Sequence, residues 1–213
     1  MKLRLAALLA VTLLSACRQT GELTAENGGG IYAVRSHCPI LGVPAGTGDV
    51  TVFNPPESRD SRAIDITATI TDVRGTCGDF GSDVVSTATF NVVALRRDAG
   101  PARQVALPYF DAAVQGGSRI VAKHIGQAVL NFPAGGIHAS TQVRAIVRVN
   151  RSVATLPASV VQTLTRPRKS GQADAAVDPL SDPSVRTAVA DATFEHLIGF
   201  EMSQDQLRYN VTR

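Results

Sequence analysis

Several features that would narrow the function are missing from this sequence of 213 residues. It has no tryptophan, few aromatic residues and no large excess of either charge, the net charge being +3. Two basic side chains, Lys2 and Arg4, stand in an N-terminal segment that we expect to be removed, which leaves 19 basic against 18 acidic groups. Such a balance gives no electrostatic support to nucleic acid as a partner, so we predict no nucleic-acid binding.

Signatures of catalysis and cofactor binding are also missing. The chain contains no Gly-x-Ser-x-Gly, no His-Glu-x-x-His, no phosphate-binding loop and no Cys-x-x-Cys. The glycine run at 28–30 precedes no strand-to-helix pattern, and we interpret it as linker. Asp79 and Asp83 lie in polar stretches without the spacing of a calcium loop, so they are interpreted as solvated turn acids.

The histidines give only a weak indication of a site. They are His37, His124, His138 and His196, and no two share metal-ligand spacing. His124 and His138 would meet a carboxylate such as Asp111 if their strands were neighbours. Glu195 and His196 are adjacent in a predicted strand, which directs their side chains to opposite faces. We therefore predict no catalytic residue, no metal and no cofactor, with an enzyme as the less favoured alternative.

What the chain does have is a distinctive N-terminus. Lys2 and Arg4 provide a positive start, the apolar run Leu5–Leu13 follows, and Leu14-Ser15-Ala16-Cys17 ends the segment with small residues before a cysteine. A secretory signal with an accidental cysteine, or an uncleaved anchor, is the alternative. The apolar run is shorter than the roughly 20 residues of a transmembrane helix, and no later segment approaches that length.

The tetrapeptide ending at Cys17 resembles the lipobox of bacterial lipoproteins. This resemblance implies a signal peptide over 1–16, a diacylglyceryl group on Cys17 and a protein held to a membrane of the bacterial cell envelope. Arg18, in place of an aspartate after the cysteine, is consistent with the outer membrane rather than the inner one. Residues 17–30 are polar and glycine-rich, which predicts a flexible tether ahead of a single β-rich domain over 31–213.

With Cys17 assigned to lipid, Cys38 and Cys77 are left as a pair in an oxidising compartment. We predict that they form a disulfide, which would close a loop of about 40 residues and stabilise the fold by roughly 4 kcal/mol. It would fasten an N-terminal edge to the sheet that contains the strand before Cys77. A metal site or a reactive thiol is disfavoured because neither cysteine has a second ligand motif beside it.

Alternation of apolar and polar residues predicts a β-rich fold. The clearest strands are expected at Ile64–Val73, Val84–Arg96 and Thr141–Arg151, with weaker ones at Arg103–Leu107 and Ser118–Phe132, where alanine leaves a helix possible. Short strands between Gly, Pro and Asp turns favour an all-β, antiparallel sandwich, immunoglobulin-like in general shape. A true immunoglobulin domain is not indicated, because there is no tryptophan between the cysteines.

The last fifty residues mix several structures. The proline-containing segment at about 165–183 predicts a long exposed loop. Asp182 as N-cap and Pro183 at the first helical position predict a short helix to about Ala192. Phe194–Met202 and Leu207–Thr212 are then expected to form a terminal hairpin.

Two clusters of basic residues stand out in a chain whose charges are otherwise balanced. The predicted loop carries three possible contacts to an anionic surface, which are Arg166, Arg168 and Lys169. A second group recurs along the polar side and exit of one strand, as a possible basic stripe on an exposed sheet face; its members are Arg144, Arg148 and Arg151. The alternative for both is a solvated surface that keeps strands from pairing with other chains.

These observations favour a non-catalytic module, anchored to membrane lipid through Cys17, that binds or scaffolds another envelope component. Such a component would be an envelope protein, for example of a secretion or pilus assembly, or a polysaccharide. The alternatives are an envelope hydrolase with an unrecognised site, since loops on a sandwich can host one without a signature, and a structural coat or spacer protein.

Overall fold

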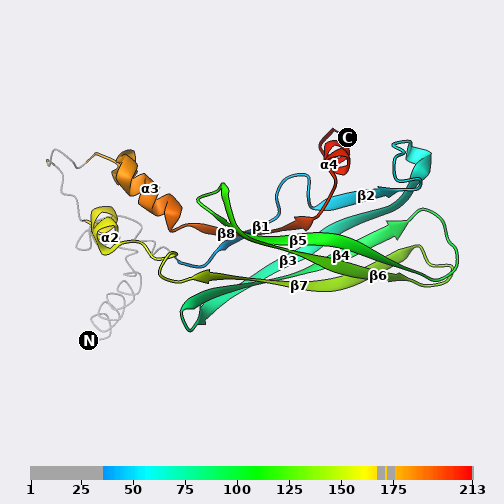
Figure 1. The fold of residues 1–213 in the computed structure, drawn as a ribbon, viewed down its shortest axis with the longest axis horizontal. Helices are drawn as coiled ribbons and strands as arrows, with labels where there is room; N and C mark the ends of the chain where they lie inside the picture. Colours follow the sequence, from blue (N-terminus) through cyan, green and yellow to red (C-terminus); the bar gives the residue numbers. More distant parts are fainter. Residues whose placement is uncertain (1–35, 167–170, 172–175, 213) are drawn as a thin grey trace, which may run out of the picture. The chain divides into compact units, whose positions relative to one another are not determined.

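The computed structural model describes residues 36–166, 171 and 176–212, and residues 36–164 and 178–212 belong to one compact unit (Figure 1). The signal peptide, Cys17, the tether, Arg168 and Lys169 all lie outside the described residues. The strands are β1 (Ile40–Gly42), β2 (Asp49–Phe53), β3 (Ile64–Phe80), β4 (Asp83–Arg96), β5 (Arg103–Gln115), β6 (Arg119–Phe132), β7 (His138–Asn150) and β8 (Phe194–Phe200). The helices are η2 (Ser61–Ala63), α2 (Ala158–Thr165), η3 (Pro179–Ser181), α3 (Pro183–Asp191) and α4 (Gln204–Thr212).

The fold is mostly β, as predicted, and consists of two four-stranded sheets. The first has the strand order β1-β8-β5-β6 and the second β2-β3-β4-β7. Neighbouring strands are antiparallel except for β1 and β8, which run parallel, with Ile40 opposite Glu195. The prediction of a purely antiparallel fold is wrong at this pair. No turn forces β1 and β8 to reverse direction, because most of the chain separates them.

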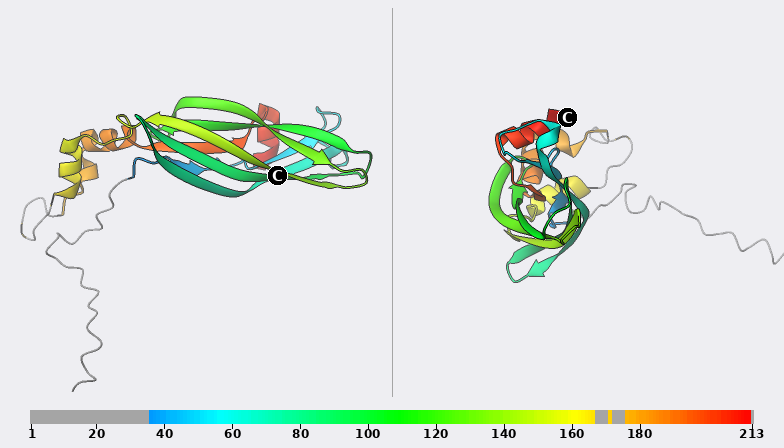
Figure 2. Two further views of the ribbon diagram at one scale, coloured as in Figure 1. Left: turned by 90° about the horizontal axis from the view of Figure 1, so that it is seen from below. Right: turned by 90° about the vertical axis from the view of Figure 1, so that its right-hand side faces the viewer.

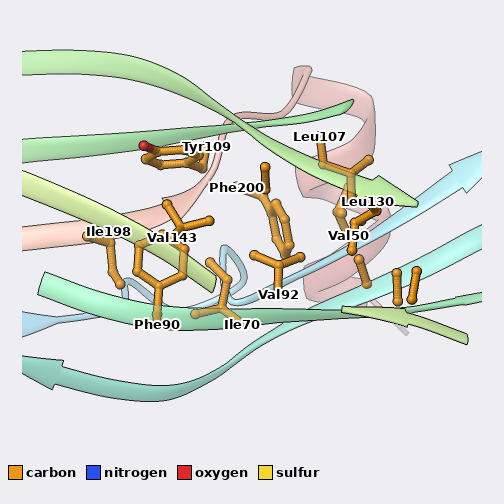
Figure 3. Close-up of a cluster of buried hydrophobic side chains, with 14 of the residues drawn as sticks. Val50, Ile70, Phe90, Val92, Leu107, Tyr109, Leu130, Val143, Ile198 and Phe200 are labelled. Atoms are coloured by element: carbon orange, nitrogen blue, oxygen red, sulfur yellow. The ribbon is translucent and has the colours of Figure 1, made fainter. Parts of the chain in front are cut away.

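The core lies between the sheets and follows the predicted alternation. Along β4 every second side chain is buried, and β7 repeats this pattern in register with it. Figure 3 shows Phe90 and Val92 of the second sheet facing Tyr109 and Phe200 of the first. The rings of Phe90 and Tyr109 meet edge to face, with 5.6 Å between centroids. Such pairs contribute about 1 kcal/mol beyond the burial of their area.

The strand β3 is longer than its alternation predicts and continues to Phe80, so Cys77 lies inside it. The predicted disulfide between Cys38 and Cys77 is present, with an S–S distance of 2.06 Å. Cys38 lies two residues before the start of β1, which belongs to the other sheet. The bridge therefore fastens this N-terminal edge strand to the sheet that contains β3, as predicted, and in doing so it joins the two sheets.

The weakly predicted strands around residues 103–132 are present in the structure as β5 and β6. Both β5 and β6 are long and pair along their whole length, so the helical alternative for the alanine-rich part of β6 is not adopted. Gly116 and Gly117 connect them, with φ of +63° and +76°. Positive φ costs glycine little, which is why these two residues can make the turn.

The helix α3 begins as predicted, with Asp182 Oδ1 accepting a hydrogen bond of 2.8 Å from the Ser184 N–H. The expected terminal hairpin is wrong: β8 is followed by α4 rather than by a second strand. The helix α4 packs beside β2, with the Phe53 and Tyr209 rings 5.1 Å apart. Of the predicted loop at 165–183, residues 167–170 and 172–175 are outside the described part, and the rest includes η3. None of the helices described is long and apolar enough to span a membrane.

Candidate functional site: the outer face of β3, β4 and β7

The outer face of the second sheet is built by strict alternation along three paired strands. Side chains on β4 and β7 that do not enter the core point away from it. The register aligns them in rows across the sheet, which are Arg74–Thr89–Arg144, Thr76–Thr87–Ile146 and Gly78–Val85–Arg148. A fourth row at the β3–β4 turn contains Phe80, Asp83 and Asn150.

These rows surround a hollow of about 390 Å³ between β3 and β7. Its lining combines apolar and basic side chains, and we call the following five residues the outer-face patch: Phe80, Val85, Arg144, Ile146 and Arg148. Phe80 is 77% exposed and Ile146 is 40% exposed, although both are large and apolar. Exposed apolar side chains grouped in a concave surface are typical of a binding site.

The two arginines of the patch have no ion-pair partner within the described part of the chain, whereas nearby cations do. Arg74 pairs with Asp72 at 2.7 Å. Arg151 contacts Asp79, whose other carboxylate oxygen lies 2.9 Å from Nε2 of His37. Asp79 therefore contacts two side chains and stays 42% exposed, so it is solvated as predicted, although it lies in β3 rather than in a turn. The guanidinium groups of Arg144 and Arg148 stay available for an anionic ligand.

The predicted basic stripe is thus present in part. Arg144 and Arg148 lie on the exposed face, while Arg151 is turned to Asp79 and to the carbonyl of Gly81. Arg166 is exposed, and its predicted companions in the loop lie outside the described residues. The sequence interpretation missed Phe80 because it ended the strand at Val73. The Gly-Ser pair that follows Phe80 is a turn signal that could have extended the strand to it.

The histidine and carboxylate hypothesis is met only in part, because β5 and β6 are neighbours and bring His124 to Asp111. His124 and Asp111 are paired across β6 and β5, but Nδ1 and Oδ1 are 3.6 Å apart, beyond hydrogen-bond distance. His124 is 70% exposed and His138 is exposed at the start of another strand. Burial raises the pKa of Asp111, opposed by His124 and by the Ile146 backbone N–H. In the described ranges no three His, Cys, Asp or Glu side chains are placed to hold a metal ion.

His196 is the other unusual titratable group, because it is fully buried in the core. Its Nδ1 lies 3.0 Å from Oγ of Ser86, across the space between the sheets. Nε2 has no hydrogen-bond partner among the described residues. As predicted, its neighbour Glu195 points to the opposite face. Burial lowers the pKa of His196 to about 4, so the ring is neutral and part of the core.

This burial predicts a loss of stability on acidification. The unfolded chain binds a proton at His196 near pH 6.5, whereas the folded protein resists protonation down to about pH 4. The stabilisation is complete above pH 6.5 and is lost as the pH falls toward 4, by about 3 kcal/mol in total. Urea unfolding of the wild type and of His196→Gln at pH 7 and pH 4 measures it. The stability difference between the two proteins should shrink by that amount at pH 4, and an unchanged difference would contradict the assignment.

Fold and site together define a mostly β protein with a basic and apolar patch on one exposed sheet face. No known protein family, curated protein or solved structure matches the chain.

Proposed function

We propose that the chain is a lipoprotein of the bacterial cell envelope that acts as a non-catalytic binding or scaffold module for another envelope component. The outer-face patch is the observation that carries this proposal. It combines Arg144 and Arg148, which have no ion-pair partner in the described residues, with the exposed apolar Phe80 and Ile146. A surface of this composition binds an anionic ligand that also has apolar parts.

Attachment to the membrane is the second part of the proposal and rests on the lipobox-like sequence at Cys17. The thirteen residues after Cys17, up to residue 30, would span roughly 20 Å as a flexible chain. The domain then stays close to one bilayer, in the outer membrane by the sorting residue Arg18. A short tether raises the local concentration of any component at that surface, so modest intrinsic affinity is enough for binding.

We also infer a sandwich arrangement, immunoglobulin-like in general shape, which the two four-stranded sheets and the shared core between them support.

Photo-crosslinking in cells tests this function without assuming the ligand. A benzophenone amino acid at Ile146 should form crosslinks to an envelope component, because that side chain lies at the centre of the patch. The same group at Val129, which is similarly exposed on β6 of the other sheet, serves as the matched control. Cys17→Ala should abolish the crosslinks and release the protein from membranes after a salt wash. Equal crosslinking at both positions would contradict the patch, and full membrane retention of Cys17→Ala would contradict the anchor.

A further inference from the structure

The beginning of the described chain contacts β3 residues that border the patch, from the side of the strand that faces the other sheet. His37 and Asp79 contact each other at 2.9 Å, and Cys38 is covalently bound to Cys77. Both Cys77 and Asp79 also line the hollow of the patch. The described chain therefore begins at the part of β3 that borders the patch, and a disulfide fixes this starting point.

The β3–β4 turn presents Phe80 at the same place. The backbone N–H of Arg151 donates to the Ser82 carbonyl at 2.8 Å, and its guanidinium group donates to the Gly81 carbonyl, so β7 holds the turn. Phe80 nevertheless projects into solvent. Figures 1 and 2 show this turn next to the end of β7, at the margin of the sheet. An exposed aromatic side chain on a fixed turn is suited to the boundary between water and an apolar phase.

Apolar surface continues from the turn toward α2. A second hollow, of about 600 Å³, lies next to Ser82 and Arg151 and is lined by Leu156 and Pro157. Val153, in the same connection, is 50% exposed. The apolar area is therefore wider than one side chain.

The charges beside this area are those that recognise phosphate. Arg144 and Arg148 lie on one face of β7 with Ile146 between them, and a guanidinium group binds phosphate oxygens through two parallel donors. Asp83 lies in the row of Phe80, and its negative charge counteracts the attraction of the two arginines for phosphate. Removing that charge therefore tests the contribution of charge to binding. Basic residues beside exposed aromatic and aliphatic ones are the combination by which peripheral proteins bind anionic bilayers.

We propose that the outer-face patch docks on the anionic phospholipid surface of the bilayer that holds the anchor, with Arg144 and Arg148 at the phosphates and Phe80 at the level of the headgroups. The inference rests on the proposed lipoprotein function, and it names the ligand of the patch. Docking would fix the orientation of the domain on the membrane. The lipid on Cys17 retains the protein at the bilayer, and the patch determines which face of the domain contacts it.

The absence of tryptophan from the chain allows a direct test. Phe80→Trp introduces a single indole into the patch, and Val93→Trp introduces one on the same face of β4, further from the turn, at a residue that is 43% exposed. The mature lipidated proteins are reconstituted into phosphatidylcholine vesicles with or without phosphatidylglycerol. With phosphatidylglycerol, emission at position 80 should shift to shorter wavelength and be quenched by brominated acyl chains, while emission at position 93 should not change.

Two charge variants complete the test in the Phe80→Trp background. Arg144→Gln with Arg148→Gln should abolish the effect of phosphatidylglycerol, and Asp83→Asn should strengthen it. Flotation with pure phosphatidylcholine vesicles reports the anchor separately, so its failure is distinguishable from failure of the patch. Equal emission at position 80 on both kinds of vesicle would overturn the proposal. So would a response to soluble polygalacturonate but not to phosphatidylglycerol, which would assign the patch to an acidic polymer.

Discussion

Replacing both Cys38 and Cys77 with serine is expected to lower the free energy of unfolding by about 4 kcal/mol. The two cysteines are separated by 39 positions, so the bond removes much of the freedom that the unfolded chain would otherwise have. It also ties the start of β1, at the edge of one sheet, to β3 of the other. Urea unfolding under oxidising conditions, with the midpoint and slope compared between wild type and variant, measures the loss.

Reduction supplies the matched control for this prediction. Wild-type protein in dithiothreitol should unfold at the urea concentration of the Cys38→Ser, Cys77→Ser variant, and the variant itself should not respond to the reductant. A loss below about 1 kcal/mol would show that the closed loop is already restricted in the unfolded chain, which is the known limit of the entropic account.

The pairing of these cysteines could be predicted by counting, but not that Cys77 lies inside β3 or that the bond joins two different sheets. The sequence after Val73 contains Gly75 and Gly78, and glycine in a strand has little intrinsic preference for it. Asp72 has a φ of +51° where the register between β3 and β4 shifts, which also interrupts the alternation. Pairing with β4 nevertheless carries the strand on to Phe80, because tertiary contacts outweigh local preference.

The wrong prediction of a hairpin at the C-terminus has a different cause. A local capping signal for a helix is present there, but the apolar segments on either side of it favour two strands. The Gln206 N–H donates to Ser203 Oγ at 3.2 Å, and the Ser203 N–H donates to Gln206 Oε1 at 2.9 Å. This reciprocal capping begins α4, and its sequence signature is Ser-x-x-Gln. Apolar residues on both sides of 203–206 suggested a hairpin, but the capping pair is the stronger indication.

For the candidate site, the sequence could place Arg144 and Arg148 on an exposed face because β7 alternates cleanly. It could not place Phe80 beside them, since that neighbourhood depends on the register of β3, β4 and β7. Register between distant strands follows from the packing of whole sheets, and no residue spacing within one strand encodes it.

Arg96 contributes to the stability of the fold in a way that the sequence pattern does not predict. Alternation predicts the end of a strand followed by a polar turn, yet the side chain is only 4% exposed. Its guanidinium group donates to four backbone carbonyls, at distances of 2.7 to 3.1 Å; these belong to Gly136, Pro101, Gly100 and Pro133. The group also lies 5.5 Å from the ring centroid of Phe132. One side chain therefore joins the loop after β4 to the loop after β6.

Arg96→Met should accordingly destabilise the protein by about 4 kcal/mol, because it removes charge-assisted bonds from several carbonyls that a thioether cannot satisfy. Arg96→Lys should recover only part of the loss, since an ammonium group cannot reach carbonyls on opposite sides of a planar fork. The neighbouring Arg97 is exposed and is the matched control: Arg97→Met should cost less than about 1 kcal/mol. Urea unfolding of the three variants measures these changes in the free energy of unfolding. Equal losses of stability at positions 96 and 97 would show that the carbonyls form hydrogen bonds to water instead. Because the two loops lie at the opposite end of β4 and β7 from the β3–β4 turn, docking of an Arg96→Lys protein on anionic vesicles should be unchanged below its unfolding midpoint.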